Sequence, residues 1–138
     1  METIEELKKR LQNDFHKVFP DELIDEYAGF RKNDIFNAIT IYIDKDNYFL
    51  EYKGFRESEN AVIKTNDYNV LLWEFKYPLI DEHASKYAMQ HCVPPKNYRR
   101  LLFQKEIELM YLLSEDFGKK KEKEISQILE KYPYTDKE

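Results

Sequence analysis

Three histidines and a single cysteine are the first residues to consider for chemistry. His83 and His91 are eight positions apart, whereas two imidazoles that bind one metal from a helix are usually four positions apart. Asp81 and Glu82 precede His83, and Cys92 follows His91, so a zinc site and a metal-dependent hydrolase are formally possible. Lone histidines and cysteines on a partly buried helix are more often packing residues. We predict neither a metal site nor a cofactor.

Cys92 also lacks the surroundings of a catalytic nucleophile. It precedes Val93-Pro94-Pro95 at the expected end of a helix, where the helix dipole disfavours a thiolate. No serine lies in a G-x-S-x-G motif, and three glycines are too few for a phosphate-binding loop. Acidic residues are abundant, so a pair of carboxylates gives no specific signal for a hydrolase. We predict that the protein is not an enzyme.

The composition indicates a single domain that covers residues 1–138. Hydrophobic residues make up 42% of the chain and aromatic residues 15%, which is enough for a core. Charged residues interrupt every apolar segment, so no stretch of about 20 apolar residues is available to cross a membrane. The N-terminal sequence METIEELKKR has no apolar signal segment, and one cysteine suits a reducing compartment. We expect a soluble protein of the cytoplasm.

The negative charge is concentrated in one segment of the chain. The net charge of -5 arises within residues 20–60, while the remaining residues are neutral in sum. Such a segment either keeps the protein soluble or attracts a basic partner. Nucleic acid is the wrong partner for it, because phosphates require positive potential.

The N-terminal half predicts one helix followed by three strands. Thr3 and Glu6 form a capping box, after which apolar residues recur at helical spacing as far as Pro20. A helical turn over residues 21–28 follows. Period-two alternation then marks three strands, over residues 39–43, 48–53 and 61–65. Their short connections allow only an antiparallel meander.

The C-terminal half predicts helices. Asn66 or Asp67 caps the first, and Pro78 should kink or break it. A second helix covers residues 97–117 with an apolar band wide enough to be buried on most of its circumference, and a third follows Gly118. We therefore predict an α+β fold with an N-terminal helix, a three-stranded antiparallel meander and a C-terminal bundle of about three helices packed on the sheet.

Two groups of cations call for different explanations. Lysines 119–121 and Lys123 have acidic neighbours one helical turn away, so we interpret this run as a solvated helix face. Arg99 and Arg100 lie in the first turn of a helix, where the dipole disfavours cations. We expect them to form ion pairs with carboxylates elsewhere in the fold or, as the alternative, to contact a partner.

Three of the eleven tyrosines lie on the predicted strands: Tyr42, Tyr48 and Tyr52. Aromatic side chains with a polar atom suit recognition surfaces, and they suit sheets equally well. We expect the inward-pointing set to pack against the core and the outward-pointing set, among acids, to be a candidate interface.

A C-terminal motif adds a family resemblance. Arg-Arg-x-x-Phe is followed by Glu-Leu and, after a charged helix, by Leu-x-x-x-Pro-Tyr-x-Asp. The matching residues are Arg99, Arg100, Phe103, Glu108, Leu109, Leu129, Pro133, Tyr134 and Asp136. Together with the β-meander and a helix that carries Trp73, this pattern resembles immunity protein family sixty-three of the bacterial polymorphic-toxin systems.

The resemblance implies a cytoplasmic protein that binds the C-terminal domain of a cognate polymorphic toxin, often a nuclease, and blocks it without chemistry. It implies scaffold roles for the motif and no catalytic residue. Because the active face of a nuclease is basic, we expect an acidic toxin-binding surface. Its predicted members are Asp44, Asp46, Glu51, Glu57, Glu59, Tyr42, Tyr48 and Tyr52. A small cytoplasmic adaptor or scaffold domain unrelated to toxins is the alternative.

Overall fold

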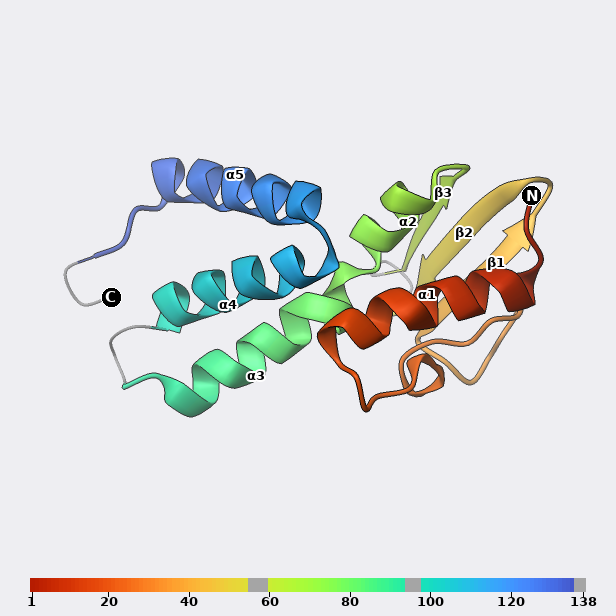
Figure 1. The fold of residues 1–138 in the computed structure, drawn as a ribbon, viewed down its shortest axis with the longest axis horizontal. Coiled ribbons are helices and arrows are strands. Elements are labelled where there is room, and N and C mark those ends of the chain that lie inside the picture. Colours follow the sequence, from red (N-terminus) through yellow and green to blue (C-terminus); the bar gives the residue numbers. More distant parts are fainter. Residues whose placement is uncertain (55–59, 94–97, 136–138) are drawn as a thin grey trace. The chain divides into compact units, whose positions relative to one another are not determined.

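The structure is a computed structural model that describes residues 1–54, 60–93 and 98–135 (Figure 1). The chain divides into two compact units, Met1–Lys76 and Tyr77–Glu138. The predicted α+β fold is confirmed, with an N-terminal helix, a three-stranded antiparallel sheet and then helices. The prediction of a single domain over residues 1–138 stays a prediction.

Helix α1 (Ile4–Val18) begins where the capping box predicts. The hydroxyl of Thr3 accepts a hydrogen bond from the Glu6 backbone N–H at 3.2 Å, and the Glu6 carboxylate accepts one from the Thr3 N–H at 3.2 Å. A short 3₁₀ turn (Ile24–Glu26) follows within the predicted helical turn. The apolar stripe of α1 is buried through Leu7, Leu11, Phe15 and Val18.

The sheet has the order β1-β2-β3 and is formed by the three predicted strands, β1 (Ile39–Asp44), β2 (Asn47–Tyr52) and β3 (Ala61–Thr65). In its register Leu50 lies between Ile41 on β1 and Ile63 on β3. Lys45 and Asp46 connect β1 to β2 with φ values of 49° and 64°, the left-handed backbone that a tight hairpin turn requires. The predicted meander is confirmed.

The helix expected after the sheet is interrupted. Helix α2 (Tyr68–Glu74) begins after Asp67, whose carboxylate accepts a hydrogen bond from the Asn69 N–H at 2.8 Å. A π-helical segment (Tyr77–Asp81) and helix α3 (Glu82–His91) follow. Pro78 lies in the π-helical segment, where its missing N–H cannot continue an α-helical ladder. The predicted break is confirmed, and the two units meet at the same place in the chain.

Both helices of the first unit reach one face of the sheet (Figure 1). Side chains alternate along a strand, so Tyr48, Leu50 and Tyr52 share a face. The Tyr48 hydroxyl donates to Glu2, just before α1, and the Tyr52 hydroxyl donates to the carbonyl of Glu74 at the end of α2. Helix α2 also contacts β2 and β3, so it covers the apolar face as expected for helices after the sheet.

The second unit contains three helices, in which α4 (Tyr98–Leu113) contacts both α3 and α5 (Glu115–Lys131). Helix α4 contributes apolar side chains to the core, namely Phe103, Leu109, Met110 and Leu113. None of the helices in the described parts of the chain is long and apolar enough to cross a membrane.

The predicted boundary at Gly118 is wrong. Helix α5 already begins at Glu115, because the hydroxyl of Ser114 caps it by accepting a hydrogen bond from the Phe117 N–H at 3.1 Å. Gly118 lies inside α5 and is buried. A Cβ atom at this position would overlap the ring of Tyr111 on α4. Glycine therefore permits the close approach of two helices and does not end one.

We predict that Gly118→Ala lowers the free energy of unfolding by about 1–3 kcal/mol, although alanine is the better helix former by about 1 kcal/mol. The cost arises because the Tyr111 ring must move away from the new methyl group. Urea unfolding measures the change.

A double-mutant cycle identifies the cause. In a Tyr111→Ala background the overlap is absent, so Gly118→Ala should be neutral or stabilising. Lys123→Ala, at an exposed position of the same helix, is the control and should change stability little. Equal destabilisation by Gly118→Ala in both backgrounds contradicts the explanation.

Candidate functional site

The predicted acidic residues do not form one compact group. Asp44 and Asp46 lie together at the β1–β2 turn, whereas Glu51 lies near the other end of β2. Asp46 is exposed. The Asp44 carboxylate is 2.9 Å from the amine of Lys32, and this hydrogen-bonded ion pair holds the pKa of Asp44 below its usual value.

Two of the predicted acids, Glu57 and Glu59, lie outside the described residues. Among the three predicted acids that the structure describes, Asp46 is the exposed one and therefore the clearest candidate for contact with a basic partner. Contact of any of these residues with a toxin stays a prediction.

Tyr42 points away from the helix-covered face but is only 7% exposed, so the expectation of an exposed outward tyrosine is wrong here. Its ring stacks on Phe49 of the neighbouring strand with centroids 5.0 Å apart, and its hydroxyl donates to Glu51 at 2.6 Å. Burial and the Glu51 carboxylate raise the pKa of Tyr42 to about 12. The carboxylate of Glu51 thus serves a contact within the sheet.

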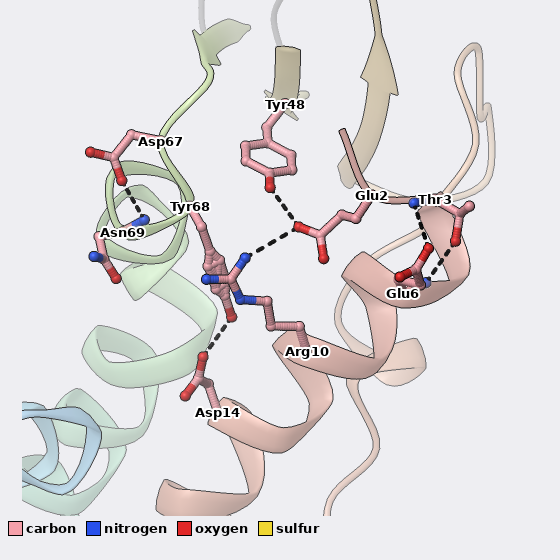
Figure 2. Close-up of polar contacts among 9 residues, drawn as sticks. All are labelled: Glu2, Thr3, Glu6, Arg10, Asp14, Tyr48, Asp67, Tyr68 and Asn69. Atoms are coloured by element: carbon pink, nitrogen blue, oxygen red, sulfur yellow. Dashed lines mark hydrogen bonds and ion pairs between the residues drawn. The ribbon is translucent and has the colours of Figure 1, made fainter. Parts of the chain in front are cut away.

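Tyr48 belongs to a polar cluster that joins α1, β2 and α2 (Figure 2). Glu2 accepts hydrogen bonds from the Tyr48 hydroxyl at 2.5 Å and from Arg10 at 3.3 Å. The Arg10 guanidinium lies 3.7 Å from the ring centroid of Tyr68, whose hydroxyl donates to Asp14 at 2.5 Å. Burial raises the pKa of both tyrosines, and that of Tyr48 reaches about 12. The cluster fixes the helices to the sheet, as expected for the inward-pointing set.

The lysine run contains a buried charge, so its interpretation as a solvated face is wrong at Lys121. Lys119 behaves as expected and pairs with Glu115, one turn away, at 3.1 Å. The side chain of Lys121 is 4% exposed, and its amine lies 2.8 Å from the Glu106 carboxylate of α4 and 3.1 Å from Glu124. Asp81, at the end of the π-helical segment, lies 3.8 Å away.

This cluster combines one ammonium group with three carboxylates. Because the cluster has an excess of negative charge and the Glu106 carboxylate is buried, this carboxylate favours its neutral form. Burial, helped by Asp81, raises the pKa of Glu106 to about 7, although Lys121 acts in the opposite direction. Burial also opposes the charged form of Lys121, but the carboxylates outweigh this effect and raise its pKa.

The cluster leaves a weak signal in the sequence. Glu106 lies three positions after Phe103 and three before Leu109, on the buried band of α4. A carboxylate in such a band needs a buried cation, and Lys121 supplies it.

The histidines and the cysteine considered for catalysis do not converge. In the parts of the chain that the structure covers, no group of three or more His, Cys, Asp or Glu residues is placed to hold a metal ion. The ring of His91 stacks on Tyr87 with centroids 4.2 Å apart, and its Nδ1 lies 2.8 Å from the Tyr87 carbonyl oxygen. Cys92 ends α3, and its backbone N–H bonds to the Ala88 carbonyl.

The C-terminal motif converges in space. The guanidinium of Arg99 donates to the carbonyl oxygens of Tyr132 at 2.8 Å and Pro133 at 2.9 Å. Arg100 lies 4.1 Å from the ring centroid of Tyr134. These contacts attach the segment after α5 to the first turn of α4, so they explain why arginines occur where the helix dipole disfavours them.

Other motif residues are buried or lie outside the described residues. The Phe103 ring lies 6.3 Å from that of Tyr134, and Leu109 is buried in α4. Trp73 is buried in α2. Asp136 lies outside the described residues, and the expected ion pairs of the two arginines with carboxylates stay a prediction.

A family model described as Immunity protein 63 matches residues 56–127, slightly more than half of the chain. The chain belongs to the Immunity protein 63 family. The resemblance found from the motif is confirmed, and the match supports a function in immunity. Neither a curated protein nor a solved structure matches the chain. Asp44, Asp46 and Glu51 precede the matched range, whereas Glu57 and Glu59 lie within it.

The buried cluster of this Immunity protein 63 member predicts a pH-dependent stability. The pKa of Glu106 is raised from 4.5 in the unfolded chain to about 7 in the folded one, so the folded state binds this proton more tightly. Its stabilising contribution is complete below about pH 4.5 and is lost as the pH rises towards 7. We expect the loss to be about 1–3 kcal/mol.

Urea unfolding between about pH 5 and 8 checks this prediction. Glu106→Gln should flatten the pH dependence, because glutamine stays neutral throughout. Glu108→Gln, on the same helix but mostly exposed, is the matched control and should leave the slope unchanged. An unaltered slope in Glu106→Gln would show that another group causes the pH dependence.

Proposed function

We propose that this protein binds the C-terminal domain of a cognate polymorphic toxin and neutralises it by covering it, without catalysis. The family match over residues 56–127 is the observation that carries the proposal. We further propose that the toxin is a nuclease and that the complex forms in the cytoplasm of the toxin-producing cell.

The charge distribution supports a basic partner. The net charge of -5 arises within residues 20–60, and in that segment Asp44 ends β1 while Asp46 is exposed in the β1–β2 turn. A hairpin turn of fixed conformation is a suitable place for charges that guide an approaching protein. Lys32 neutralises Asp44 in the free protein, so a basic side chain of the toxin would compete with Lys32 for that carboxylate.

A non-catalytic role is supported by the surroundings of the candidate catalytic groups. His91 and Cys92 lie at the end of α3 and contact only groups of their own helix among the contacts described above. The carboxylates around Lys121 form ion pairs with it, and the closest of them, Glu106, is buried together with Lys121.

Co-expression tests the proposed function directly. The proposal expects a neighbouring gene to encode a toxin domain. That domain is expressed with and without the chain, and growth is measured. We expect the chain to restore growth and to form a complex that a pull-down detects. Unrestored growth together with no complex contradicts the proposal and favours the adaptor alternative.

The contribution of the acidic turn is tested by the double variant Asp44→Asn, Asp46→Asn. Asparagine tolerates the left-handed backbone at position 46, so the turn should keep its shape. We expect association with the toxin domain to slow by about 3–10-fold at low salt, because steering charges act mainly on the association rate. The difference should vanish at high salt.

The matched control is Asp116→Asn with Glu130→Gln, which makes the same change in net charge on helix α5. Rapid-mixing kinetics at several salt concentrations measure both variants. Equal slowing by the two pairs would assign the effect to net charge alone, and unchanged kinetics would remove the turn from the binding surface.

A further inference from the structure

The buried charge cluster of the second unit contains a hydrogen-bond acceptor that receives no hydrogen. Asp81 ends the π-helical segment, and its Oδ1 atom is buried and forms no hydrogen bond with the residues that the structure describes. The amine of Lys121 is 3.8 Å away, which is too long for a hydrogen bond. A buried carboxylate oxygen without a hydrogen bond is costly, so we expect a donor beside it.

Neither the backbone nor Lys121 supplies this donor. Asp81 directly precedes α3, yet its side chain accepts no capping hydrogen bond from that helix. The amine of Lys121 is closer to other carboxylates, at 2.8 Å from Glu106 and 3.1 Å from Glu124. The donor must therefore come from another neighbouring group.

Glu106 of α4 is placed to supply the missing hydrogen. Its side chain is 8% exposed, and its carboxyl group interacts with that of Asp81. A carboxylic acid donates a hydrogen bond, whereas an ionised carboxylate only accepts. Two ionised carboxylates in contact repel each other, so one shared proton removes this repulsion and also satisfies the Oδ1 atom of Asp81.

Charges from several elements surround Glu106. Lys121 and Glu124 lie on α5, and Asp81 lies on the π-helical segment. Helix α3 also packs against α4. Its charged or titratable side chains are Glu82, His83, Lys86, Tyr87 and His91. Histidine is the side chain that most readily changes charge between about pH 5 and 8, so His83, close to Asp81 in sequence, is the competing source of a pH effect.

We propose that Glu106 and Asp81 share one proton, and that this proton holds the end of the π-helical segment on α4 as a pH-sensitive switch. At low pH the proton joins the two carboxyl groups. At higher pH it leaves to water, and both groups are then charged. Lys121 carries one positive charge and cannot neutralise these two carboxylates and Glu124 together. The Asp81 side chain, which is 29% exposed, then turns into solvent, whereas Glu106 stays inside.

The proposal names the acceptor of the proton and a local consequence of its loss. Burial raises the pKa of Glu106, and the charge of Asp81 acts in the same direction, which agrees with a proton held here close to neutral pH. Helix α3 begins at Glu82, the residue after Asp81. Release of Asp81 therefore loosens the first turn of α3 before the chain as a whole unfolds.

Carbon-13 NMR of the side-chain carboxyl carbons tests the shared proton in the unaltered full chain between about pH 5 and 9. Groups that share a proton titrate as a pair. The carbons of Glu106 and Asp81 should both shift at the same midpoint, at about 7. A shift at Glu106 without one at Asp81, or no shift at either carbon in this range, overturns the proposal.

The variant His83→Gln is the control for this titration. It removes the imidazole and leaves both carboxyl groups in place, so the common midpoint should persist. Loss of both shifts in His83→Gln would assign them to the histidine and overturn the shared proton.

Hydrogen exchange tests the switch. Relative to the unfolded chain, the protection of the N–H groups of residues 79–84 should fall about 10-fold or more from about pH 6 to 8, because one pKa unit corresponds to a tenfold change in an equilibrium. Protection within α5 should change less than about 3-fold. Glu106→Gln should remove the pH effect, because its side-chain amide stays uncharged and donates to Asp81 at every pH. Unchanged protection, or an equal loss in every helix, overturns the switch.

Discussion

The helix that begins at Tyr68 ends at Glu74, four residues before Pro78, because a proline has no N–H to donate to the carbonyl four residues earlier. The first compact unit ends at Lys76, and the π-helical segment begins the second. Leu79 and Ile80 of this segment are fully buried. Asp81, its last residue, lies 3.8 Å from the amine of the buried Lys121. Before the break, α2 is short enough to lie on β2 and β3 and to receive the Tyr52 hydroxyl at its end. The break thus separates a helix that covers a sheet from helices that cover one another.

The sequence correctly predicted the features of the fold that depend on residues close to one another in the chain. The capping box of Thr3 and Glu6, the alternation in the strands and the break at Pro78 depend on residues close in sequence, and all three are present. The errors concern contacts between distant residues. Gly118 was expected to end a helix, but its role is set by the Tyr111 ring on the neighbouring helix. Lys121 was expected in solvent. Its partner Glu106 lies on α4, fifteen positions earlier, and no residue near Lys121 in the sequence indicates that contact.

The C-terminal motif and the exposed loop before β1 depend on different kinds of contact. Arg99, Arg100 and Phe103 contact the segment after α5, so they stabilise the second unit and leave a recognisable pattern. A loop such as Asp34–Ile35–Phe36 has no periodicity, and its conformation depends on Gly29 and Lys53 at some distance along the chain. Composition located the acidic segment, but it could not indicate which of its apolar residues remain outside the core.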